Sequence, residues 1–178
     1  MTSRRIQNLA LIGSMGTGKS SVGRMAADIL RFTFLDTDDV IVARAGKSIA
    51  DIFKDNGEAA FRDLESRLVA ELARRTKTVV ATGGGMGANE SNLESFKAHS
   101  LVVCLWASPE KIWERVRHQS HRPLLNNPDP LQKIRDLLNA REPFYRMADV
   151  LINTEMRSLR EVAMQVVHQF HVGQAAHP

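Results

Sequence analysis

A glycine-rich segment near the N-terminus most constrains what this chain can fold into. Residues 13–20 read Gly-Ser-Met-Gly-Thr-Gly-Lys-Ser and match G-x-x-x-x-G-K-[ST] at every fixed position. An apolar run, residues 9–12, precedes the segment, and a helical pattern follows it. A phosphate chain needs this context, because backbone N–H groups must converge on it at the positive end of a helix dipole. A chance glycine-rich turn would not require the flanking strand and helix.

The segment therefore predicts a site for ATP or GTP with magnesium. Lys19 can reach the outer phosphates, and the hydroxyl of Ser20 can ligate Mg²⁺. The candidate nucleotide-binding residues of the loop are Gly13, Ser14, Met15, Gly16, Thr17, Gly18, Lys19, Ser20 and Ser21.

Predicted strands and helices alternate along the 178 residues, which indicates one α/β domain with a mainly parallel sheet. The expected strands are 7–12, 33–36, 78–82, 100–105 and 149–152. The expected helices are 18–31, 38–45, 48–54, 57–74, 90–97, 109–118, 129–146 and 157–170. The tail from Gly173 to Pro178 is expected to be frayed.

Charge and apolar content exclude several classes of protein. The net charge of +4 and a pI near 9.6 are compatible with nucleic-acid binding, but basic and acidic residues are interleaved without an aromatic-rich basic stripe. A small anion such as a nucleotide is the better-matched partner. No apolar run approaches the roughly 20 residues of a membrane span, so we expect a cytoplasmic protein. The single cysteine, Cys104, lies in an apolar strand and is expected to be structural.

Two stretches interrupt the alternation of strands and helices. Residues 37–62 insert short helices after the second strand, and residues 118–130 form a polar, proline-rich connection that carries Arg122. A phosphotransferase must keep water from the γ-phosphate, and closing segments are the usual means. Both stretches are therefore predicted to be functional.

The expected carboxylates follow the second strand. The strands at 78–82 and 100–105 end without an acid, whereas the second strand ends in Asp36-Thr37-Asp38. Ligands of a parallel sheet gather at the carboxyl ends of its strands, so these acids should face the phosphates. One acid would help to bind the metal, and the other would contact the hydroxyl of the acceptor. The competing interpretation is helix capping by Thr37 or Asp38.

A triple glycine and two arginines complete the candidate site. Gly83, Gly84 and Gly85 follow a strand, where backbone can approach a bound group closely and donate N–H groups to it. A tight structural turn is the alternative. Arg62 and Arg141 are candidates for holding an anionic acceptor, because the guanidinium binds carboxylates in a bidentate manner. Surface arginines without a function are the alternative for both.

In order and spacing, these motifs resemble those of the shikimate kinases over about residues 7–155. The shared elements are Gly13–Ser20, the Asp-Thr-Asp motif, Gly46-Lys47-Ser48-Ile49, Phe61-Arg62 with Glu65, the triple glycine, Arg122-Pro123-Leu124-Leu125 and the segment from Arg141 to Tyr145. The phosphate loop alone is common to many families, but this combination is specific.

The resemblance implies a three-layer P-loop kinase of the nucleoside-monophosphate-kinase type. Its five-stranded parallel sheet would have the order 2-3-1-4-5. Residues 1–178 would form one domain with a core at about 7–170, a substrate-binding region at about 37–62 and a lid at about 117–127. The implied reaction moves the γ-phosphate of ATP to the 3-hydroxyl of shikimate, on the way to chorismate and the aromatic amino acids.

The resemblance also implies roles for single residues. Lys19, Asp38 and Arg122 would be catalytic, with Asp38 at the acceptor hydroxyls and Arg122 on the transferring phosphate. Ser20 and Asp36 would hold Mg²⁺, the latter through water. Substrate would be bound by Asp38, Arg62, Arg141 and the backbone of Gly83, Gly84 and Gly85. Adenine would rest on Arg117 or Arg115 and on a loop near Asn153-Thr154, and Arg117 and Arg122 are both candidates for nucleotide binding.

Two alternatives to a shikimate kinase remain at this stage. A gluconate kinase would also bind an acceptor that has a carboxylate and vicinal hydroxyls. A nucleotide-binding regulatory domain would bind the nucleotide without turnover. The combination of Lys19, Asp38 and Arg122 argues against the regulatory domain. No coiled-coil pattern or large apolar face is evident, so we expect a monomer.

Overall fold

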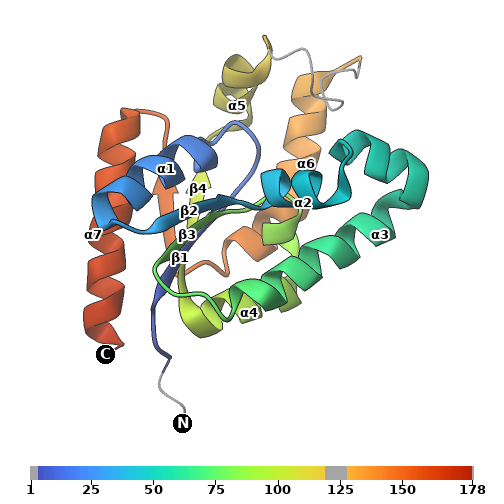
Figure 1. Cartoon of the computed structure of the whole chain (residues 1–178). Helices are drawn as coiled ribbons and strands as arrows, with labels where there is room; N and C mark the ends of the chain where they lie inside the picture. Colours follow the sequence, from blue (N-terminus) through green and yellow to red (C-terminus); the bar gives the residue numbers. More distant parts are fainter. Residues whose placement is uncertain (1–3, 119–127, 178) are drawn as a thin grey trace.

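A five-stranded parallel sheet forms the centre of the computed structural model, which describes residues 4–118 and 128–177 (Figure 1). The strand order is β2-β3-β1-β4-β5, as predicted. The strands are β1 (Asn8–Ile12), β2 (Thr33–Asp36), β3 (Thr78–Ala81), β4 (Ser100–Trp106) and β5 (Val150–Asn153). All of their pairings are parallel, so the carboxyl ends of the strands share one edge of the sheet.

Helices cover both faces of the sheet and make the fold three-layered. On one face α1 (Lys19–Leu30) packs against α7 (Leu159–Ala176). The other face is covered by α3 (Ile49–Leu72), α4 (Glu90–His99) and α6 (Pro130–Tyr145). Three shorter elements surround the carboxyl edge: α2 (Thr37–Ala45), the 3₁₀ turn η1 (Met86–Ala88) and α5 (Pro109–Val116).

The central strand β1 shows why the sequence folds in this way. All five of its residues are buried. Leu9 and Leu11 contribute to the core under α1 and α7, whereas Ala10 and Ile12 contribute to the core on the opposite face. A strand buried on both faces reads as a continuous apolar run, which is typical of parallel sheets. Cys104 in β4 is also fully buried, and burial raises the pKa of its thiol to about 12, so it is a structural residue.

Two helices, α3 and α7, differ from the expected pattern. The helices expected at 48–54 and 57–74 appear as one element, α3, which bends at Gly57 (φ 80°, ψ 171°). The expectation of a frayed tail was wrong, because α7 continues to Ala176. Gly173 packs closely against Leu101 and Ile6, and the side-chain amide of Gln174 donates to the Ile6 carbonyl at 3.2 Å.

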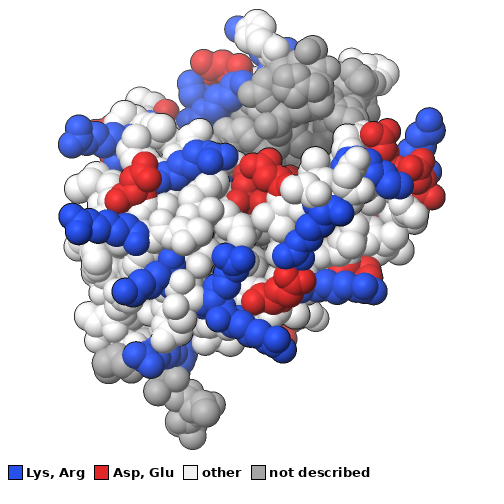
Figure 2. Space-filling model, viewed as in Figure 1, with Lys and Arg blue, Asp and Glu red and all other residues white. Residues whose placement is uncertain are grey.

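The charged surface is mixed on the face that Figure 2 shows. Basic side chains are spread over this face with acidic ones between them, rather than gathered in one stripe. Within residues 4–118 and 128–177, no helix combines the length and apolar character needed to cross a bilayer.

Candidate active site

The phosphate loop joins β1 to α1 and is closed by its own hydrogen bonds. Gly16 (φ 73°) and Gly18 (φ 90°) take the left-handed conformation that starts the helix. The Thr17 hydroxyl and the Lys19 ammonium each donate to the Ser14 carbonyl, both at 2.8 Å. The loop is thus preformed, with the N-terminus of α1 directly behind it.

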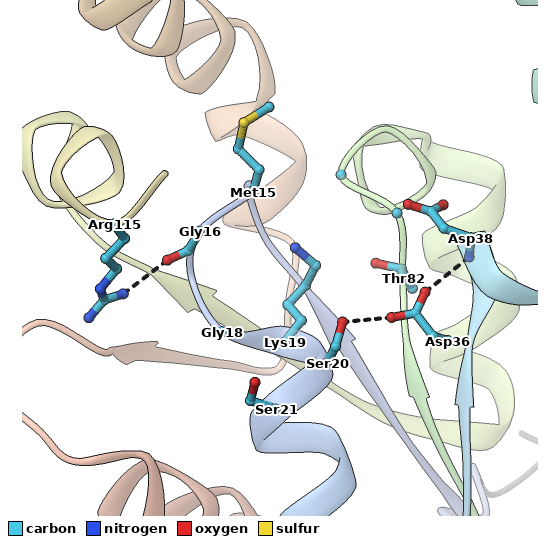
Figure 3. Close-up of a pocket in the computed structure, with 12 residues that line it drawn as sticks. Met15, Gly16, Gly18, Lys19, Ser20, Ser21, Asp36, Asp38, Thr82 and Arg115 are labelled. Atoms are coloured by element: carbon cyan, nitrogen blue, oxygen red, sulfur yellow. Dashed lines mark hydrogen bonds between the residues drawn. The ribbon is translucent and has the colours of Figure 1, made fainter. Parts of the chain in front are cut away.

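A cleft of about 360 Å³ opens beside this loop (Figure 3). Lys19 points into the space between the loop and the end of β2, where Asp36 and Asp38 lie. The residues that line the cleft are Met15, Gly16, Gly18, Lys19, Ser20, Ser21, Asp36, Asp38, Thr82, Gly83, Gly84 and Arg115. Ten of these twelve were predicted as nucleotide, metal or substrate ligands, and Arg115 was an open alternative to Arg117; only Thr82 was not.

Ser20 and Asp36 form the pair expected at the metal. The Ser20 hydroxyl donates to Asp36 Oδ2 at 2.6 Å, while Asp36 Oδ1 accepts from the backbone N–H of Asp38 at 3.1 Å. Asp36 is therefore also the N-cap of α2, a role that we had considered for Thr37 or Asp38. Two adjacent oxygens fit Mg²⁺, which is usually held by one or two protein groups together with phosphates and water. In the described part of the chain no larger cluster of potential metal-ligating side chains occurs.

The triple glycine lies against three of the predicted substrate ligands, one for each glycine. A Cβ atom added to Gly83 would overlap the Asp38 carboxylate, with Cγ at 3.2 Å. One on Gly84 would lie 2.9 Å from Arg141 Nη1, and one on Gly85 would lie 2.7 Å from Arg62 Cζ. No residue with a side chain fits these places unless a ligand moves, so the turn is more than a structural link.

Arg62 is held by two acids of its own helix, α3. Its Nη1 donates to Glu65 Oε2 at 2.7 Å, and its Nη2 donates to Glu58 Oε1 at 3.0 Å. The Glu65 side chain is only 1% exposed, and burial raises the pKa of its carboxyl although the Arg62 guanidinium opposes the shift. Glu65 was part of the recognised pattern but was not predicted to act in the site; its spacing of three residues from Arg62 on one helix was the signal.

Arg141 comes from α6, together with Tyr145 four residues later on the same helix face. The Tyr145 hydroxyl donates to the Gly84 carbonyl at 3.1 Å. The N–H of the preceding residue, Gly83, donates to the Thr37 hydroxyl at 2.9 Å. Neither Tyr145 nor Thr37 was a predicted site residue.

Arg115 connects the phosphate loop with the segment after β5. Its Nη1 donates to the Gly16 carbonyl at 3.1 Å and to the Thr154 hydroxyl at 2.9 Å, and its Nη2 donates to the Thr154 carbonyl. Arg117 is exposed and does not line the cleft. Of the two arginines considered for adenine, Arg115 is therefore the one at the cleft.

Comparisons with known proteins agree on one family. The model of the shikimate kinase family matches residues 15–171. The shikimate kinase of Caldanaerobacter subterraneus subsp. tengcongensis is 41% identical over 165 residues, which cover 93% of this chain and 96% of that protein. That of Symbiobacterium thermophilum is 42% identical, with 91% and 95% covered.

The chain belongs to the shikimate kinase family.

Solved structures support the same assignment. A shikimate kinase from Acinetobacter baumannii in complex with shikimate has a TM-score of 0.89 and 37% identity, and the match covers 96% of each chain. A gluconokinase from Sinorhizobium meliloti has a TM-score of 0.64 at 19% identity, which shows a common fold alone. Family membership therefore favours shikimate over gluconate as the acceptor and an enzyme over a regulatory domain.

Most of the site predicted for this family member is brought together at one edge of the sheet. Lys19, Ser20, Asp36 and Asp38 meet in the cleft, and Arg62 and Arg141 lie around the glycine turn. Arg122 and most of the expected lid fall within 119–127, outside the described residues.

Proposed function

We propose that this enzyme transfers the γ-phosphate of ATP to the 3-hydroxyl of shikimate, giving shikimate 3-phosphate and ADP. One observation carries the proposal: Asp38, Arg141 and Arg62 converge on a glycine turn whose first two residues also line the phosphate-loop cleft. An acceptor with a carboxylate and vicinal hydroxyls matches this combination of two arginines and an acid. Family membership supports the same reaction.

On the donor side, Lys19 and the backbone of residues 13–21 would bind the phosphates. Ser20 and Asp36 would hold Mg²⁺, which, when bound, neutralises charge on the β- and γ-phosphate oxygens. The Ser20–Asp36 contact of 2.6 Å supports this pairing. Arg115, rather than Arg117, would contact adenine, because it links the phosphate loop to the segment at Thr154.

On the acceptor side, Asp38 would orient the 3-hydroxyl and accept its proton as the phosphate is transferred. Arg62 and Arg141 would bind the carboxylate, and the Gly83–Gly85 backbone would complete the pocket. Arg122 would neutralise charge on the transferring phosphate, a role that rests on the family pattern. The described residues that we assign to ATP and to shikimate all lie on one chain. We therefore propose that a monomer suffices for activity.

The role of Asp38 is tested by replacing it with asparagine. We expect Asp38→Asn to lower kcat with shikimate at least about a hundredfold in a coupled assay for ADP, because the base is lost while the shape is kept. The affinity for MgATP, measured by calorimetry, should change less than about twofold. Parallel assays with gluconate should show no comparable turnover. Near-normal kcat in Asp38→Asn would remove this residue from the mechanism.

A further inference from the structure

The glycine turn lies against one acidic and two basic ligands, so its position affects the spacing among all three. Gly83 lies against Asp38, Gly84 against Arg141 and Gly85 against Arg62, each within van der Waals overlap of any added side chain. A shift of this backbone by a few tenths of an ångström would therefore change the distances among all three ligands. The turn itself has no side chains with which to anchor itself.

Two hydroxyl groups from different helices reach the turn. Thr37, fully buried at the start of α2, accepts the hydrogen bond of the Gly83 N–H at 2.9 Å. Tyr145 is 5% exposed and lies near the end of α6; its hydroxyl donates a hydrogen bond to the Gly84 carbonyl at 3.1 Å. The first hydrogen bond uses an N–H group of the turn, and the second uses a carbonyl group of the turn. Together the two hydrogen bonds fix the position and the rotation of the turn.

The elements that supply these hydroxyls, α2 and α6, also supply two of the three ligands, Asp38 and Arg141. Thr37 directly precedes Asp38, and Tyr145 lies one helical turn after Arg141. Each hydrogen bond therefore ties the turn to the backbone that bears the neighbouring ligand. Burial raises the pKa of Tyr145 to about 12, although the nearby Arg141 guanidinium opposes the shift, so its hydroxyl remains a donor at physiological pH.

We propose that Thr37 and Tyr145 are positioning residues of the acceptor site: their hydroxyls clamp the Gly83–Gly84 turn and so set the spacing of Asp38, Arg62 and Arg141. Neither side chain needs to touch the acceptor for this role. Loss of either hydroxyl weakens acceptor binding and leaves nucleotide binding unchanged, since the phosphate loop is closed by separate hydrogen bonds. This inference rests on the proposed assignment of the acceptor ligands.

The test compares Tyr145→Phe and Thr37→Val with the parent enzyme. Both changes keep the shape of the side chain and remove the hydroxyl. We expect the dissociation constant and KM for shikimate to rise about 3- to 10-fold in each, the range for one lost hydrogen bond, with the KM for ATP within about twofold. Thr37→Ser keeps the hydroxyl and should restore the parent shikimate KM to within about twofold.

A matched control separates positioning from general stability. Thr78, at the opposite end of β3, is 2% exposed, and its hydroxyl donates to the Thr76 carbonyl at 3.2 Å. Thr78→Val therefore also removes a buried threonine hydroxyl but should leave both KM values unchanged. If Tyr145→Phe and Thr37→Val lower the melting temperature as Thr78→Val does and leave the shikimate KM unchanged, the inference is wrong. Because the two hydroxyls come from different elements, a folding failure in one variant leaves the other to decide.

An additional variant distinguishes this inference from the assignment on which it rests. Arg141→Ala should raise the shikimate KM more than either hydroxyl variant, because it removes a direct ligand. An unchanged KM in Arg141→Ala would overturn the acceptor assignment itself. A raised KM in Arg141→Ala, with no effect of the hydroxyl variants, would overturn only the clamp.

Discussion

Gly85→Ala should separate acceptor binding from stability. Gly85 has φ −82° and ψ −32°, which alanine adopts without strain. Replacing glycine at such a position stabilises a protein by about 0.4–1 kcal/mol, because the unfolded chain loses freedom. The added Cβ, however, would lie 2.7 Å from Arg62 Cζ and 2.8 Å from Nη2.

The side chain that must move is the guanidinium of Arg62, not the backbone. All three of the nearest atoms to the added Cβ belong to that flexible group, so the fold can absorb the change. Arg62 would leave its place beside the turn and lose the contact that we propose for it with the acceptor carboxylate. A hydrogen bond to a charged group is worth about 1.5–3 kcal/mol, which corresponds to a rise in shikimate KM of about 10- to 150-fold.

The assay combines thermal unfolding with steady-state kinetics at saturating MgATP. We expect an unchanged or higher melting temperature, a raised shikimate KM and an ATP KM close to that of the parent enzyme. Gly173→Ala is the control for the substitution itself, because its Cβ would meet only the ends of Leu101 and Ile6 side chains, far from the cleft. A parent-like shikimate KM in Gly85→Ala would refute the placement of Arg62 as an acceptor ligand.

Two further predictions concern the binding of ATP and the stability of the fold at acid pH. Arg115→Ala should raise the ATP KM about tenfold, since a charged group with several hydrogen bonds is lost, whereas Arg117→Ala should change it less than about twofold; equal effects of the two variants would contradict the assignment of Arg115. Burial alone would raise the pKa of Asp149, but hydrogen bonds from Arg4 and from the Val102 N–H lower this pKa below its ordinary value. Because the folded pKa is depressed, this stabilisation is fully present above the unfolded pKa and is lost as the pH falls through the folded pKa. Asp149→Asn should therefore lower the free energy of unfolding by about 1–3 kcal/mol at pH 7, with a smaller difference near pH 3 in denaturant titrations; a difference independent of pH would argue against the charged pair.

The fold was predictable because its signals are local. The apolar run of β1 and the glycine-rich loop that begins α1 each specify an element within a few residues. The boundary at the C-terminus could not be predicted, because the last turns of α7 are joined to residues far away in the chain, as in the hydrogen bond from Gln174 to the Ile6 carbonyl. Composition alone makes that segment look like a tail.

The residues that gather at the cleft were predictable where a motif specifies the residue type. Lys19 and Ser20 follow from the loop pattern, and Asp36 and Asp38 follow from their place at a strand end. Glu65, Thr37 and Tyr145 were not predicted, because their importance lies in what they hold rather than in their own reactivity. The choice between Arg115 and Arg117 depends on which side of α5 faces Thr154, and the register of one short helix is not fixed by sequence spacing alone.

The fit of the glycine turn has a consequence for inhibitor design. A compound that takes its affinity from the main-chain atoms of Gly83–Gly85 would meet a surface that the enzyme cannot easily change. Any side chain added there would displace Asp38, Arg141 or Arg62, all three of which we assign to the acceptor. Resistance by substitution at these three positions would thus weaken acceptor binding, so the main chain of the turn offers a durable contact.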